Sequence, residues 1–185
     1  MHWLCCNINS FTRESLDLAF LNLTQTRAEH IGKMHHQQDR DRSLAAQLLL
    51  QTLLQQQGMP AMALHRKPDG QPFLEGSSLH VSLSHSEEMV ACAISSTPVG
   101  IDIEKIRPID LRICSRFFTP EEQLYVQGNE QDSDSSRYTR FFEIWTAKEA
   151  YFKRLGTGIT DLRSVNVLQL QRQCHIVDNY MIHIL

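Results

Sequence analysis

One short segment constrains the fold of this chain more than any other: Val-Gly-Ile-Asp-Ile-Glu-Lys at residues 99–105. Its isoleucines and acids alternate, and a period of two is typical of a β-strand with one apolar and one polar face. Such a strand buries Ile101 and Ile103 and holds Asp102 and Glu104 side by side on its other face. Taken alone, two acids in this pattern usually mark the solvated face of an edge strand.

A second segment, Trp-Thr-Ala-Lys-Glu-Ala-Tyr-Phe-Lys at residues 145–153, predicts part of a helix. It adds Glu149, with Lys148 and Lys153 on either side. Three carboxylates with flanking lysines suit a hard divalent cation bound to a phosphate ester, because Mg²⁺ prefers oxygen ligands and lysines balance phosphate charge. The alternative for Glu149 and Lys153 is an ordinary ion pair on an exposed helix face.

The rest of the chain predicts strands mixed with two long helices, without a regular βαβ alternation, which favours an α+β fold. Helical spacing of leucines marks one helix over residues 43–56, and the other runs from about residue 137 to 155, where Gly156 ends it. Strands are expected at residues 2–9, 80–84, 89–94 and 100–104 and among the apolar positions between 165 and 184. A further helix begins at residues 119–122, and the polar residues 128–136 predict a flexible loop.

Composition excludes several classes of protein. The 185 residues are 42% hydrophobic and 21% charged, which is ordinary for a globular protein. A net charge of −3 argues against a nucleic-acid binder with a broad basic face. No apolar run is long enough for a signal peptide or a membrane span, and five scattered cysteines without Cys-x-x-Cys pairs indicate reduced thiols. We expect a cytoplasmic protein without nucleic-acid or membrane partners.

Four motifs, in their order and spacing, resemble the 4′-phosphopantetheinyl transferase superfamily, in particular its surfactin-synthetase-activating type. They are Ser-Leu-Ser-His-Ser (82–86), Gly-Ile-Asp-Ile-Glu (100–104), Phe-Phe-Thr-Pro-Glu-Glu (117–122) and Trp-x-x-Lys-Glu-Ala-x-x-Lys (145–153). The resemblance implies a Mg²⁺-dependent enzyme that transfers the phosphopantetheine arm of coenzyme A to a serine of an apo acyl or peptidyl carrier protein and releases 3′,5′-ADP. It also implies two similar halves related by a pseudo-twofold axis, each with a small, mostly antiparallel sheet on a long helix, and an active site between them.

The halves are expected at residues 1–98 and 99–185. The first would bind the 3′-phosphate and adenine end of coenzyme A, and the second would carry the metal site and the carrier-protein side. An acidic carrier would meet a local basic patch of Arg107, Arg112 and Arg116. Relatives of this type usually carry further strands after the point where this chain ends, so the second half is expected to be shortened. Because the two halves of one chain can form a complete site, we expect a monomer.

The resemblance implies a metal site of Asp102, Glu104 and Glu149. Glu149 is also a candidate for the base that takes the proton from the carrier serine, with a metal-bound water as the alternative. Lys153 would neutralise the leaving phosphate, and Lys148 would contact a phosphate of coenzyme A.

Two further motifs carry lesser candidates. Glu122 is another candidate for the base, but Thr119 and Glu122 also have the form of a capping box, which satisfies amide donors at a helix start. Ser84 and His85 suggest a nucleophile with its base, yet adjacent strand residues point to opposite faces and cannot readily pair. The resemblance assigns both to coenzyme A binding.

Four positions of the first half correspond to places where the family holds the 3′-phosphate and adenine end: Arg27, His30, Arg42 and Ser43. The chain departs from the family pattern at two coenzyme A contacts. A lysine is usual at the place of His30, and the Gly-Lys-Pro turn has become Gly70-Gln71-Pro72. Both changes remove positive charge near a phosphate, which predicts weaker affinity for coenzyme A.

Two other functions stay open. One is a non-catalytic homologue that binds coenzyme A or a carrier without turnover, which His30, Gln71 and the short C-terminus favour. The other is a metal-dependent phosphohydrolase or nuclease, because acids and a lysine around a metal also serve that chemistry. Coenzyme A binding separates a transferase from the phosphohydrolase or nuclease, and Mg²⁺-dependent turnover separates it from the non-catalytic homologue.

Overall fold

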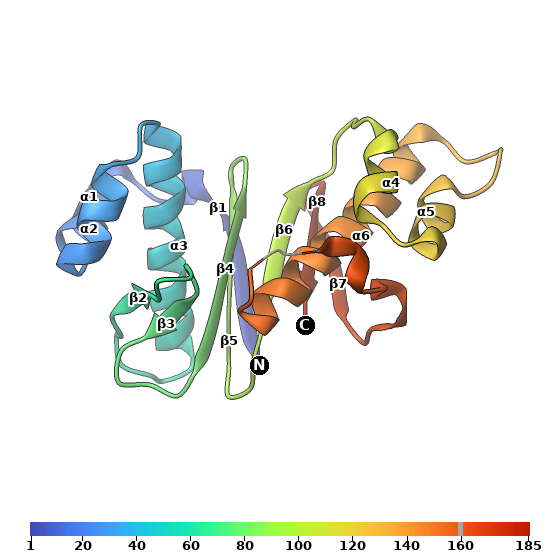
Figure 1. Ribbon diagram of the computed structural model, residues 1–185. Helices are drawn as coiled ribbons and strands as arrows, with labels where there is room; N and C mark the ends of the chain where they lie inside the picture. The colour runs from blue at the N-terminus through green and yellow to red at the C-terminus, as the bar shows by residue number, and fades with distance from the viewer. Residues whose placement is uncertain (159–160) are drawn as a thin grey trace. The chain divides into compact units, whose positions relative to one another are not determined.

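The computed structural model describes residues 1–158 and 161–185, and the chain forms two compact units, Met1–Val99 and Gly100–Leu185. Figure 1 shows helices and antiparallel sheets in both, which confirms the predicted α+β class. The helices are α1 (Arg13–Leu21), α2 (Gln25–Gly32), α3 (Gln37–Gln56), α4 (Cys114–Phe117), α5 (Pro120–Gln127) and α6 (Asp134–Leu155). The strands are β1 (His2–Asn7), β2 (Leu64–Arg66), β3 (Pro72–Leu74), β4 (His80–Ser86), β5 (Met89–Ser95), β6 (Ile101–Lys105), β7 (Gln173–Val177) and β8 (Tyr180–Ile184).

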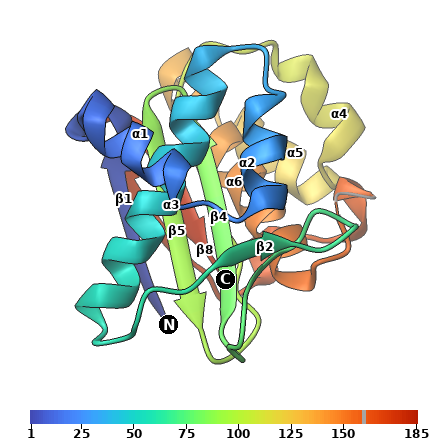
Figure 2. The ribbon, with the colours of Figure 1, turned by 90° about the vertical axis from the view of Figure 1, so that its left-hand side faces the viewer.

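The N-terminal unit is built on a three-stranded antiparallel sheet in the order β1-β5-β4. Figure 2 shows α3 lying across this sheet, and the short β2–β3 hairpin forms a second, separate pairing. Leucines on one face of α3, among them Leu50 and Leu54, are fully buried against Val90 and Cys92 of β5. Burial of this apolar surface holds the helix on the sheet.

The C-terminal unit pairs β6 and β7 with the central strand β8, all antiparallel. The long helix α6 packs on β6 and β8. Aromatic side chains dominate the core beside this helix, with Phe118 and Phe141 fully buried and their ring centroids 5.2 Å apart. Gly156 ends α6 in a left-handed conformation, as the sequence predicts.

The sequence misplaces several elements. The polar segment 128–136 is not wholly a loop, because α6 begins at Asp134, where Ser133 accepts a hydrogen bond from the amide of Ser136 and caps the helix. The apolar positions 165–170 form 3₁₀ turns instead of strands, since Asn166 caps a turn at Val167–Gln169. Only β7 and β8 are closing strands in this region. Within the described residues, no helix is long and apolar enough to cross a membrane.

Candidate active site

Strand β6 presents Asp102 and Glu104 on one face. Ile101 and Ile103, which alternate with them, are fully buried. Asp102 lies opposite His183 of β8, and Glu104 lies opposite Met181. Asp102 is only 4% exposed and Glu104 is half-buried, so the acids do not form the solvated face that alternation alone would suggest.

Helix α6 brings two more charged residues to this face of β6. The ammonium of Lys153 forms an ion pair with Asp102, with Nζ 2.6 Å from Oδ1. Glu149, one turn before Lys153, is half-buried. Burial above all, then the charge of Asp102 and to a smaller extent that of Glu104, raise its pKa to about 7 against the opposing charge of Lys153. Asp102, Glu104 and Glu149 are therefore close enough to repel one another.

The donor set suits a divalent cation in its chemistry. Three carboxylates supply only oxygen, which Mg²⁺ prefers, and a bound cation would remove their mutual repulsion. The positions of these side chains do not form a metal-binding group. Across residues 1–158 and 161–185, no three His, Cys, Asp or Glu side chains are arranged to hold a metal ion. Lys153 supplies the positive charge at Asp102 instead.

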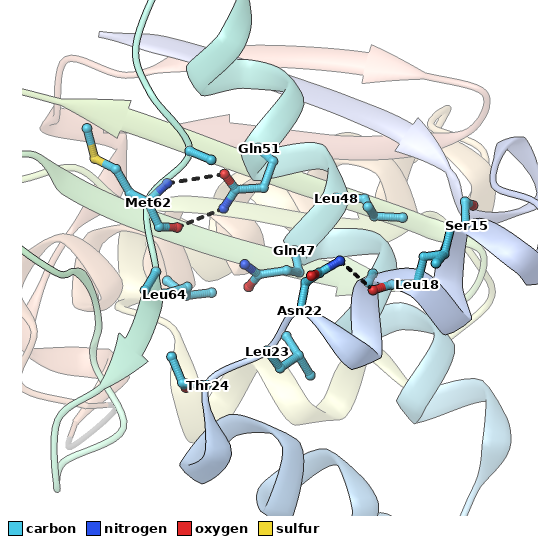
Figure 3. A pocket seen from close by; sticks show the side chains of 13 residues that line it. Ser15, Leu18, Asn22, Leu23, Thr24, Gln47, Leu48, Gln51, Met62 and Leu64 are labelled. Atoms are coloured by element: carbon cyan, nitrogen blue, oxygen red, sulfur yellow. Dashed lines mark hydrogen bonds between the residues drawn. The ribbon is translucent and has the colours of Figure 1, made fainter.

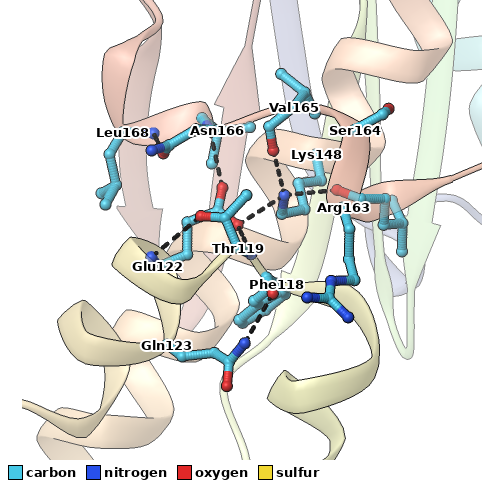
Figure 4. A network of polar contacts seen from close by, with 12 residues as sticks. Phe118, Thr119, Glu122, Gln123, Lys148, Arg163, Ser164, Val165, Asn166 and Leu168 are labelled. Carbon is cyan, nitrogen blue, oxygen red and sulfur yellow. Dashed lines mark hydrogen bonds and ion pairs between the residues drawn. The ribbon is translucent and has the colours of Figure 1, made fainter.

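Lys148, also on α6, lies in a different place. Its side chain is fully buried, and its Nζ lies 2.7 Å from Oε2 of Glu122 on α5. It also donates hydrogen bonds of 2.6 Å to the carbonyl oxygens of Leu162 and Val165. Figure 4 shows this network around the start of α5. An ammonium has three N–H donors, and these three acceptors match them in number.

Glu122 is equally occupied. Its carboxylate accepts hydrogen bonds from the amides of Thr119 and Val167, both at 2.8 Å, and the hydroxyl of Thr119 accepts from the amide of Glu122. This is the capping box that the sequence offered as one reading. Both side chains are fully buried and hold α5, α6 and residues 162–167 together, while the phosphate contact of Lys148 and the base role of Glu122 stay predictions.

The N-terminal unit contains a cluster of positive charge, which we call the cationic cluster: Arg27, His30, Lys33 and Arg66. Arg27 on α2 is only 5% exposed, and its Nε has no hydrogen-bond partner among the described residues. Burial and, after it, the charge of Arg66 lower its pKa to about 10. The pKa of His30 is lowered by burial and then by Arg27, Arg66 and Lys33. Cations that gather without a carboxylate partner favour an anionic ligand.

The other predicted coenzyme A contacts are engaged within the unit. Arg42 forms an ion pair with Asp39, with a separation of 2.7 Å, and donates a hydrogen bond to the carbonyl of Glu87. Ser43 is buried, and its hydroxyl lies 3.7 Å from the sulfur of Met34. These contacts hold α3 to its neighbours in the same unit and do not join either residue to the cationic cluster.

The remaining predicted contacts lie on strands and turns. Gln71 accepts a hydrogen bond of 2.6 Å from Lys67 across the β2–β3 turn. Ser84 and His85 are neighbours on β4, where Ser84 is buried and His85 is exposed. Their different burial agrees with side chains on opposite faces of the strand, so they do not form a nucleophile and its base.

A cavity of about 590 Å³ lies elsewhere in the N-terminal unit, between α1, α3 and residues 61–64. Figure 3 shows Leu18 of α1 and Asn22, the residue that follows this helix, near Gln47 and Leu48 of α3. Its lining contains no charged side chain and none of the predicted site residues. A neutral cavity of this kind does not suit a phosphate.

Sequence reasoning missed two members of the cationic cluster, Lys33 and Arg66. Arg66 carries no motif, because it precedes the Lys-Pro-Asp-Gly turn and falls at the end of a three-residue strand. Only the fold of the β2–β3 hairpin beside α2 brings it near Arg27 and His30, which lie far from it in the sequence. Its basic character alone gave no signal.

The amino-acid sequence of this chain matches a family model and several known proteins. A model described as the 4′-phosphopantetheinyl transferase superfamily matches residues 98–179. The 4′-phosphopantetheinyl transferase gsp of Aneurinibacillus migulanus is 37% identical over 82% of this chain and 63% of its own length. The transferase Sfp of Bacillus subtilis is 28% identical over 75% and 62%, and psf-1 of Bacillus pumilus is 33% identical over 66% and 53%.

The chain thus spans less than two thirds of the length of these relatives. The matched segment contains β6 and α6 whole, and with them Asp102, Glu104, Glu149 and Lys153. Three of the four motifs that suggested the resemblance, at residues 100–104, 117–122 and 145–153, lie within the matched segment, and the motif at residues 82–86 precedes it. The chain belongs to the 4′-phosphopantetheinyl transferase superfamily.

Proposed function

We propose that this protein transfers the 4′-phosphopantetheine arm of coenzyme A to a serine of an apo acyl or peptidyl carrier protein and releases 3′,5′-ADP. The observation that carries the proposal is the contact of β6 with α6, which gathers Asp102, Glu104, Glu149 and Lys153. The names of the relatives support the same reaction.

Asp102, Glu104 and Glu149 are the residues that would hold Mg²⁺. When bound, the cation would neutralise charge on the pyrophosphate of coenzyme A. The support is the chemistry of the donors and their mutual repulsion, which a cation relieves. Because Lys153 now pairs with Asp102, cation and lysine compete for this carboxylate in our proposal.

The chain's own residues perform the remaining tasks. Glu149 accepts the proton of the carrier serine, and a pKa of about 7 suits a base that works near neutral pH. The serine oxygen forms a bond to the β-phosphorus as the bond from that phosphorus to the bridging oxygen breaks. Lys153 balances the negative charge that develops on the departing 3′,5′-ADP. Catalysis then rests on positioning and charge neutralisation.

We assign the N-terminal unit to the 3′-phosphate and adenine end of coenzyme A. Arg27 and His30 of the cationic cluster are the residues best disposed to bind the phosphate, and Arg27 lacks a carboxylate partner among the described residues. Arg42, Ser43, Gln71, Ser84 and His85 stay candidates for the rest of the nucleotide. We also propose a cytoplasmic monomer.

An acidic carrier protein would meet Arg107, Arg112 and Arg116. The side chain of Arg112 is 91% exposed but forms an ion pair with Asp110, and Arg116 lies over the ring of Phe117. Reversal of Arg112 and Arg116 to Glu should raise KM for the carrier and leave KM for coenzyme A unchanged, because the change is confined to the carrier side. Steady-state kinetics with each substrate varied in turn measures this, and an unchanged carrier KM would remove the patch from the proposal.

Chromatographic detection of 3′,5′-ADP tests the reaction against its alternatives. A transferase releases 3′,5′-ADP from coenzyme A only when an apo carrier is present. Release without a carrier would indicate a phosphohydrolase. Coenzyme A binding without release under either condition would indicate a non-catalytic homologue.

A further inference from the structure

The cavity of about 590 Å³ between α1, α3 and residues 61–64 lies outside the sites described so far. Its volume falls within the range of small-molecule sites, which are mostly apolar with a few polar groups that fix the orientation of the ligand. Leucines, alanines and Met62 form most of the lining, and none of the lining side chains is charged. Leu18 of α1 lines the cavity and is 53% exposed, so a ligand can enter beside it.

One polar group in the lining has no partner. The side chain of Asn22 donates a hydrogen bond of 2.9 Å to the carbonyl of Leu18, and Gln51 exchanges two hydrogen bonds with the backbone of Met62. Gln47 lies one turn before Gln51 on the same side of α3 (Figure 3). Its Oε1 is buried and accepts no hydrogen bond within the described residues. A buried acceptor without a donor costs free energy, and a ligand that supplies the donor removes this cost.

The outer edge of β2 adds backbone groups to the same cavity. The amide of Glu75 donates a hydrogen bond of 3.0 Å to the carbonyl of Ala63, so these two residues form a hydrogen-bonded pair. Because such pairs alternate along an antiparallel ladder, the next pair, Leu64 with Leu74, is not hydrogen-bonded. The amide and carbonyl of Leu64 therefore point away from β3, to the side from which Gln51 of α3 contacts this segment.

We propose that this cavity binds a neutral small molecule with an apolar body and a secondary amide. The N–H of the ligand donates to Oε1 of Gln47, the ligand carbonyl accepts from the amide of Leu64, and the apolar body packs against Leu48 and Met62. A charged ligand is disfavoured, because no lining side chain carries the opposite charge. The inference does not depend on the proposed function, since no lining residue belongs to the proposed coenzyme A site.

NMR of the full chain, labelled at the methyl groups of alanine, leucine and methionine, tests the inference with two probes. N-butylbenzamide and butyl benzoate have nearly the same shape, but only the first has an N–H donor. N-butylbenzamide should shift the methyl signals of Leu48, Met62 and Ala63 and leave those of the C-terminal unit unchanged. Butyl benzoate should bind about tenfold more weakly, because it leaves Oε1 of Gln47 without a donor. Excess coenzyme A should not displace either probe.

A pair of variants on α3 isolates the hydrogen bond. Gln47→Met removes the acceptor and keeps a similar side-chain shape, so it should bind both probes equally, with the affinity that the unmodified protein has for the ester. Its thermal stability should be equal or higher, because a buried acceptor without a donor is lost. Gln55→Met is the matched control: Gln55 is exposed on the same helix, away from the cavity, and this variant should keep the preference for the amide.

Three results would overturn the inference. An absence of methyl shifts with both probes at millimolar concentration would show that the cavity holds only water. A preference for the amide that persists in Gln47→Met, or that disappears equally in Gln55→Met, would show that Gln47 does not bind the N–H group. Displacement of N-butylbenzamide by coenzyme A would show that the cavity is part of the coenzyme A site. None of these results bears on transfer to a carrier protein, so the proposed function is tested separately.

Discussion

Lys148 and Lys153 lie on the same helix, but their side chains make different contacts and therefore have different roles. Both belong to one motif on α6, and the family resemblance implies phosphate contacts for both. The structure pairs Lys153 with Asp102 at the candidate site and buries Lys148 against Glu122. The acceptors of Lys148 at residues 162 and 165 lie in turns that no periodicity marks, so its structural role could not be predicted.

We predict that Lys148→Met destabilises the protein by about 3 kcal/mol or more, because it leaves the carboxylate of Glu122 buried without its cation. Urea unfolding measures the loss. The fraction that stays folded should bind coenzyme A as tightly as the unmodified protein. A variant of normal stability with weakened coenzyme A binding would contradict this account and return Lys148 to the phosphate site.

At the level of elements, the close approach of β6 to α6 depends on Gly100. A Cβ built on Gly100 would collide with the carbonyl oxygen of Ala150 and lie 2.7 Å from the amide nitrogen of Arg154, both backbone atoms of α6. Gly100 also exchanges two hydrogen bonds of 3.0 Å with Leu185, which extends the pairing of β6 with β8. The glycine therefore sets the distance between the elements that carry the candidate site.

Gly100→Ala should separate β6 from α6, with a cost of at least about 1–3 kcal/mol and a larger proportional loss of transferase activity, because Asp102 and Glu149 move apart. Thermal unfolding and transfer kinetics measure the two effects. Gly32→Ala is the control: a Cβ there meets nothing within 4 Å, and its stability should be unchanged or slightly higher. Normal stability in Gly100→Ala would contradict the close approach.

Elements with strong periodicity were predictable from the sequence, and elements fixed by local capping were not. Helix α6, its glycine end and strand β6 follow from apolar spacing and a left-handed glycine. The sequence marks no helix at α1, whose face leaves Leu18 and Leu21 exposed and so breaks the usual pattern. The capping hydroxyl of Thr12, which accepts from the amide of Ser15, was the available signal.

At the scale of the whole molecule, the acids of the site were predictable because they share a strand and a helix motif. The cationic cluster was predictable only in part, since Arg27 and His30 matched a family pattern while Arg66 did not. Contacts between segments far apart in sequence depend on the tertiary fold, and a single sequence carries no direct signal for them.

Stability should also depend on pH through His183, which is fully buried. Its Nδ1 lies 2.7 Å from the hydroxyl of Thr146, and its Nε2 accepts a hydrogen bond from Arg172. Burial, followed by the charges of Arg172 and His175, lowers its pKa to about 3. The folded state therefore keeps His183 neutral, whereas the unfolded state takes up a proton below about pH 6.5.

Because the unfolded state binds more protons, the free energy of unfolding should fall as pH drops from about 6.5 toward 3, by up to about 1.4 kcal/mol per pH unit from this group. Urea unfolding at several pH values, compared with His183→Gln, isolates the contribution. The variant should show a flatter dependence whatever its absolute stability. Equal slopes in the two proteins would show that His183 is not held neutral.

Intact-mass spectrometry of apo acyl and peptidyl carrier proteins, incubated with this protein, coenzyme A and Mg²⁺, tests the central claim most directly. The account predicts a mass increase of one phosphopantetheine group on a carrier serine. The increase should vanish with EDTA and fall by about 10²–10³ in rate in Glu149→Gln. An unmodified carrier despite coenzyme A binding, or full activity in both EDTA and Glu149→Gln, would contradict it.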